Sequence, residues 1–162
     1  MAVFGSARSR PTHWLKTGLA QARRVARVDI KTSEFAGGVG SGFLIDGSLF
    51  GEALKDLPIL LTCHHVIPGW RDVSPLSSLS DVTVVFEGML EDPSPRVTAK
   101  CHHILIEFAS EQLNYTLVLL DRWPGVVADC LLAPQLPPPG SKVFVVSYPR
   151  GGGLAVSLDD NE

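Results

Sequence analysis

The chain contains 162 residues, of which 45% are hydrophobic and 19% are charged. This length can bury one hydrophobic core, or one domain and part of a second, and no apolar run approaches the roughly 20 residues of a membrane helix. No secretory signal segment opens the chain, and its three cysteines are an odd number, which argues against a disulfide framework. We therefore expect a reducing, cytoplasmic compartment and no membrane partner.

The net charge of −3 is unevenly distributed. Residues 1–31 carry a balance of +6, whereas residues 32–162 carry −9. A basic front segment can contact nucleic acid or an anionic surface, and an Arg-rich, acid-poor segment also fits an organelle transit peptide. The interpretation that we favour is a solvated helix face, so we expect no nucleic-acid partner.

The first predicted elements are a short helix and two strands. Residues 12–22 can form an amphipathic helix. The hydrophobic period then changes to two, because Ala26, Val28 and Ile30 alternate with charged residues, as in a half-buried strand. The glycine-rich run 36–45 leads into a second strand.

Further strand-like runs follow, each rich in Ile, Val and Leu. They are PILLTC at 58–63, DVTVVFEG at 81–88, CHHILIEF at 101–108, YTLVLL at 115–120, SKVFVVSYP at 141–149 and a last short run within 150–162. The proline-rich stretch at 133–140 suits a connector. About six strands before it predict an all-β barrel or sandwich, whereas the one or two after it cannot normally hold a core alone.

Two Cys-His-His triplets raise the hypothesis of a zinc site. Residues i and i+2 of a strand share a face, so two paired strands would offer a tetrahedral Cys₂His₂ set. The residues concerned are Cys63 and His65 in one triplet, and Cys101 and His103 in the other. Neither triplet sits in a tight glycine-rich knuckle, however. We favour Cys101 and His103 as ordinary strand residues of the core or rim, and expect no metal and no cofactor.

Three motifs occur in order along the chain: GVGSGFLI followed by LLTCHHVI, then EQLNYTLVLLD, then GSKVFVVSYPRGGGLAVSL. Together they resemble the trypsin-like, chymotrypsin-fold serine peptidases, nearest to their bacterial, HtrA-like branch. The resemblance implies a six-stranded chymotrypsin-like β-barrel followed by the first strands of an incomplete second barrel. The domains implied are a basic segment with a short helix at 1–24, a first barrel at 25–132, a connector at 133–140 and a truncated second barrel at 141–162.

The resemblance also implies a catalytic histidine three residues after the motif threonine, Thr62. That residue is His65, which would act as general base and then as general acid, because imidazole has a pKa near neutrality and two distinct nitrogens. It would stand beside the cleft between two barrels, while His64 would point the other way. Cys63 cannot reach His65 with attack geometry, and we expect a buried thiol there.

At the position of the family's triad aspartate this chain carries Asn114, a departure from the pattern. An amide cannot stabilise an imidazolium by charge, and it can donate to Nδ1 and hold the wrong tautomer. In serine peptidases this change lowers kcat by about 10⁴. The explanations that remain open are a deliberately inactivated variant, a natural pseudo-enzyme, a slow enzyme that uses a nearby carboxylate such as Glu111 or Asp121, and an ordinary turn residue.

The family's nucleophile motif, G-[ND]-S-G-[SG], does not occur in the sequence. Ser41 belongs to the first-barrel motif and is expected to be a small packing residue, and neither Ser147 nor Ser157 has the flanking glycines of a nucleophile. The oxyanion hole, which the family builds from backbone N–H groups around its serine, is missing with it. The resemblance thus implies the N-terminal part of a serine endopeptidase, a hydrolase, cut after Glu162 or nearby and inactive as it stands.

The partners implied are a polypeptide substrate and the missing C-terminal half of the same protein as a second chain. By analogy with trypsin-like modules of bacterial defence systems, a caspase-like or other regulatory protein is a further expected partner. Two alternatives stay open: a natural pseudo-peptidase that binds a protein partner, and a Cys/His zinc-binding β-domain.

Overall fold

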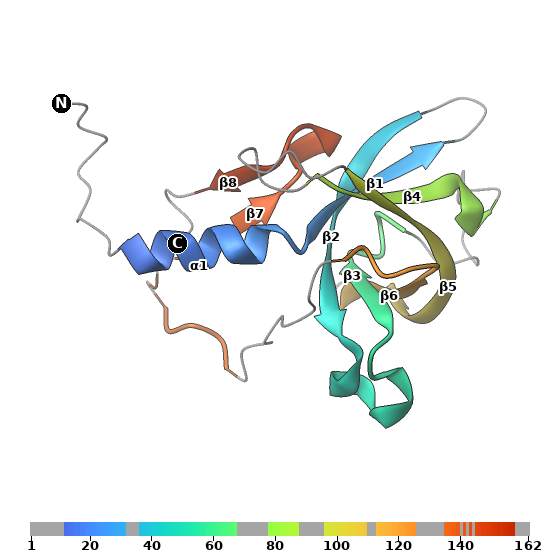
Figure 1. Cartoon of the computed structure of the whole chain (residues 1–162), viewed down its shortest axis with the longest axis horizontal. Coiled ribbons are helices and arrows are strands. Elements are labelled where there is room, and N and C mark those ends of the chain that lie inside the picture. Colours follow the sequence, from blue (N-terminus) through green and yellow to red (C-terminus); the bar gives the residue numbers. More distant parts are fainter. Residues whose placement is uncertain are drawn as a thin grey trace.

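The computed structural model describes residues 12–31, 36–67, 78–87, 96–109, 113–125, 135–139, 141, 143 and 145–157. One α-helix, α1 (Thr12–Ala22), precedes the strands of this described part (Figure 1). The strands are β1 (Val25–Lys31), β2 (Ala36–Asp46), β3 (Pro58–Thr62), β4 (Val82–Phe86), β5 (Val97–Ala109), β6 (Asn114–Leu120), β7 (Val145–Ser147) and β8 (Ala155–Ser157). Short 3₁₀ turns lie at η1 (Gly47–Phe50), η2 (Glu52–Leu54), η3 (Leu79–Asp81) and η4 (Pro149–Gly151). No helix among these residues has the length and apolar character needed to cross a bilayer.

Strands β1 to β6 close into an antiparallel barrel with the order β1-β2-β3-β6-β5-β4, and β4 pairs back onto β1. The expectation of an all-β barrel is confirmed. The alternation in β1 explains how its sequence forms a wall of the barrel: Ala26, Val28 and Ile30 are buried, and the residues between them are not. Figure 1 shows the barrel on one side of the molecule, with the β7–β8 sheet and α1 on the other.

Aliphatic side chains that lie opposite one another on neighbouring strands fill the barrel interior. Leu44, Leu60 and Val118 lie opposite one another in β2, β3 and β6, and all three are fully buried. Burying each such side chain contributes about 1.5–3 kcal/mol. On the outer face of the same strands Ile45 and Ile59 are also buried, and leucines of the β2–β3 connection pack against them.

Strand β5 contains two irregularities that decide which way its side chains face. The register shifts between Cys101 and His103, and again between Ile104 and Ile106. A β-bulge adds an unpaired residue and turns the following side chain to the other face. Cys101 is therefore buried in the core while His103 is exposed, so these two residues do not share the face that the zinc hypothesis required.

Strands β7 and β8 form a separate two-stranded antiparallel sheet. This hairpin lies against the barrel, because β7 and η4 contact β1 and β2. Residues 135–139 of the expected connector form neither helix nor strand, and all of them are exposed. The hairpin as the start of a second barrel, and the domain boundaries drawn around it, stay predictions.

Candidate active site

His65 stands on a short turn that begins where β3 ends. The backbone N–H groups of Val66 and Ile67 both donate to the carbonyl of Cys63, at 3.0 and 3.3 Å. Val66 and Ile67 are buried in the barrel core, whereas His65 is exposed. The apolar pair after the histidine thus anchors the turn and presents the imidazole at the surface.

Two neighbouring strands fix this turn from either side. The backbone of β2 approaches so closely at Gly40 that a Cβ there would lie 2.6 Å from Cγ2 of Val66. From β6, the buried hydroxyl of Thr116 donates to the carbonyl of Ile67 at 3.1 Å. Glycine at one point and a hydroxyl at the other are therefore needed for the backbone position of His65.

Asn114, the first residue of β6, meets His65 through both ends of its amide. Its Oδ1 accepts the backbone N–H of His65 at 3.3 Å, and its Nδ2 lies 3.1 Å from Nδ1 of the imidazole. The structure thus brings together the two residues that the sequence singled out, 49 positions apart. Their catalytic role stays a prediction.

These two contacts determine which ring nitrogen of neutral His65 carries the proton. A backbone N–H can only donate, so the amide atom facing it must be the oxygen. Nδ2 then faces the ring and donates to Nδ1, which must be unprotonated to accept. In neutral His65 the proton consequently lies on Nε2, so the nitrogen pointing away from Asn114 is a donor and not a base.

The two carboxylates considered as substitutes for a triad aspartate do not take that place. Asp121 follows the opposite end of β6, roughly 20 Å from Asn114 at about 3.3 Å per residue. There its Oδ1 accepts the backbone N–H of Lys100 at 2.8 Å, which lowers the pKa of this carboxyl. Glu111 lies outside the described residues.

The zinc hypothesis required the two triplets to lie on paired strands, and they do not. β3 pairs with β2 and β6, whereas β5 pairs with β4 and β6, so a strand separates Cys63 from Cys101. In the part of the chain that the structure describes, no group of three or more His, Cys, Asp and Glu side chains could hold a metal ion. Burial also raises the pKa of the Cys101 thiol to about 12, which disfavours the thiolate that a metal requires.

Cys63 is exposed, so the expectation of a buried thiol is wrong. The reason is local: β3 ends at Thr62, and Cys63 already belongs to the turn outside the barrel wall. Of the serines considered, Ser147 lies half-buried in β7 and Ser157 is exposed in β8. Ser41 does more than pack, because its Oγ accepts the backbone N–H of Tyr148 at 2.7 Å.

Sequence reasoning did not assign a role to Thr116 or Tyr148. Thr116 is an inward-facing polar residue within an apolar strand, and that break in the pattern was the signal for a buried hydrogen bond. Tyr148 is buried even though it follows a short, partly exposed strand, and no local sequence pattern indicates this.

No protein-family model matches the chain, and neither does any curated protein. What the fold and the site define is therefore a closed antiparallel barrel that carries an exposed histidine held by an asparagine.

Proposed function

We propose that this chain forms the first barrel, and the start of the second, of a trypsin-like serine endopeptidase, and that Asn114 makes this form inactive. The observation that carries the proposal is the double contact of Asn114 with His65. An aspartate in the same position would accept the His65 backbone N–H with one oxygen and a protonated Nδ1 with the other. Asn114 makes the two contacts that a triad aspartate would make. At Nδ1 of the ring, however, it donates a hydrogen bond where an aspartate would accept one.

In the proposed enzyme, His65 takes the proton of a serine hydroxyl supplied by the second barrel while that oxygen attacks the scissile carbonyl. His65 then passes the proton to the leaving amine, which is general base and general acid chemistry by one imidazole. Nε2 accepts the proton in the first step and donates it in the second. With Asn114 donating to Nδ1, Nε2 already carries a hydrogen and cannot begin the first step.

The test uses the protein encoded by the complete gene, with Asn114→Asp. We expect hydrolysis of a mixed peptide library to rise by a factor on the order of 10⁴ over the protein with Asn114. The matched control is the double variant Asn114→Asp, His65→Ala, which should lose this gain. A well-folded Asn114→Asp protein that cleaves no peptide bond would count against the proposal of a serine endopeptidase.

The second candidate function is a pseudo-peptidase that binds a protein partner. It is favoured by the same pair, because an imidazole with Nε2–H is a stable hydrogen-bond donor at the surface. A gene that encodes Asn114 and no downstream nucleophile, together with the absence of a gain from Asn114→Asp, would select this function over the first.

A further inference from the structure

Ser41 lies where the barrel, the β7–β8 hairpin and the strand leading to His65 meet. Its Oγ accepts the backbone N–H of Tyr148 at 2.7 Å, and its backbone carbonyl accepts the hydroxyl of Thr62 at 2.7 Å. Thr62 is the last residue of β3, immediately before the turn that carries His65. One residue of β2 thus joins two segments that are 86 positions apart in the sequence.

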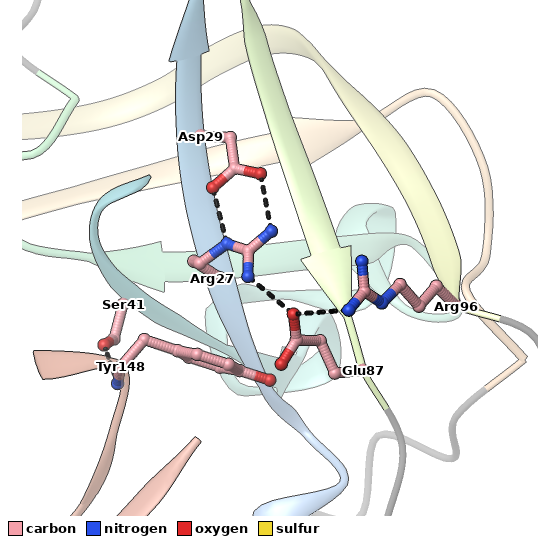
Figure 2. A network of polar contacts seen from close by, with 6 residues as sticks. All are labelled: Arg27, Asp29, Ser41, Glu87, Arg96 and Tyr148. Carbon is pink, nitrogen blue, oxygen red and sulfur yellow. Dashed lines mark hydrogen bonds and ion pairs between the residues drawn. The ribbon is translucent and has the colours of Figure 1, made fainter. Parts of the chain in front are cut away.

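The hairpin is held at this point by burial as well as by the hydrogen bond. Ser41 pairs with Arg27 across β1 and β2, and both face outward because the neighbours of Arg27 point into the core. Figure 2 shows the ring of Tyr148 lying beside Arg27, with its hydroxyl directed toward Glu87. Tyr148 is only 1% exposed, and burial raises the pKa of its hydroxyl.

The charged residues beside the ring of Tyr148 bind one another. The guanidinium of Arg27 binds Asp29 through two hydrogen bonds of 2.7 and 3.0 Å and Glu87 through a third of 2.5 Å (Figure 2). The hydrogen bond to Asp29 is the main cause of the raised pKa of Arg27. A bidentate pair of this kind has a defined geometry, which orients the guanidinium of Arg27 beside the ring of Tyr148.

From these contacts we infer that Ser41 is a positioning residue, which sets the place of the β7–β8 hairpin relative to His65. The inference rests on the proposed function for the role of His65, since in a two-barrel peptidase the groups that meet His65 come from the unit that the hairpin begins. The coupling itself is a property of this chain and is measured without any activity. Ser41→Ala removes the Oγ acceptor and leaves the carbonyl bond to Thr62 in place.

The experiment compares amide hydrogen exchange and the ring ¹⁵N signals of His65 in the unsubstituted chain, Ser41→Ala and Ser41→Thr. Losing one hydrogen bond should accelerate exchange of the Tyr148 amide by about tenfold and shift the His65 signals. Ser41→Thr keeps the hydroxyl, so it should restore both. The control Ser48→Ala removes an exposed hydroxyl beyond the far end of β2 and should change neither.

The inference is overturned if Ser41→Ala leaves the Tyr148 amide exchange and the His65 signals unchanged. It is also overturned if Ser41→Thr fails to restore them while Ser41→Ala and Ser41→Thr are equally stable to urea. Failure of the proposed function is seen separately, as the absence of peptide hydrolysis by Asn114→Asp, and leaves these exchange measurements valid.

Discussion

Val66 occupies the space that a side chain at position 40 would need. A Cβ at Gly40 would lie 2.6 and 2.9 Å from the two γ-methyl carbons of Val66, closer than real Cβ contacts allow. The glycine-rich sequence of β2 is therefore explained at this position by packing against the residue that follows His65.

Gly40→Ala should lower the free energy of unfolding by about 1–3 kcal/mol, the usual effect of overfilling a packed core. It should also displace the His65 turn, which a change in the histidine ring signals would report. Gly153→Ala is the matched control, because a Cβ there meets nothing within 4 Å. Equal stability of the two variants in urea would show that the close approach of β2 is not a constraint.

Thr116→Val should destabilise the protein by about 1–3 kcal/mol, because it leaves the buried carbonyl of Ile67 without its donor. Thr116→Ser keeps the hydroxyl and should recover most of the loss. Thermal or urea unfolding measures both variants, with the exposed Thr98→Val as a control for the change of residue type. Equal stability of the valine and serine variants would show that the hydrogen bond from Thr116 to Ile67 does not stabilise the protein.

The cysteines of the two triplets should differ sharply in reactivity. Cys63 is exposed, whereas Cys101 is buried with a pKa raised to about 12 by burial. Thiolate is the reactive form, so an alkylating reagent at neutral pH should modify Cys63 and leave Cys101 intact until the protein unfolds. Peptide mapping by mass spectrometry identifies the site, and Cys63→Ser is the control. Rapid alkylation of Cys101 in the folded chain would contradict its burial.

Asp121 should make stability depend on acid pH. Its hydrogen bond from the Lys100 backbone N–H lowers its pKa in the folded state below the unfolded value of about 3.9. A depressed carboxyl pKa contributes stability above the unfolded pKa and loses it as the pH falls through the folded value. Asp121→Asn should therefore be less stable at neutral pH and should lose less on acidification to about pH 2. Parallel stability curves for the two proteins would show that this carboxylate is not linked to folding.

The barrel could be predicted from the sequence because most of its strands follow the period-two rule. Ala26, Val28 and Ile30 alternate with charged residues, and the expected helix at 12–22 has the bounds found for α1. The bulges of β5 could not be predicted, because Ile104, Leu105 and Ile106 are apolar at consecutive positions and show no period-two pattern that an extra residue would interrupt. That is why the zinc hypothesis could place Cys101 and His103 on one face, which the register shift between them rules out.

For the candidate site, His65 and Asn114 could be singled out from the sequence, but the contacts that position them could not. The proximity of His65 and Asn114 was expected from a resemblance, because nothing in the spacing of the two residues brings them together. Ser41 and Tyr148 meet across a tertiary contact between β2 and the segment after β7. Such a contact depends on how separate segments pack, so local patterns do not predict it.

The account depends most on the direction of the hydrogen bond between Asn114 and the ring of His65. Side-chain ¹⁵N–¹H correlation spectra of the neutral histidine measure this directly, because the protonated and unprotonated ring nitrogens have distinct shifts. We expect the proton on Nε2 in the chain with Asn114 and on Nδ1 in Asn114→Asp. A proton on Nδ1 in the chain with Asn114, or no change on substitution, would contradict the account.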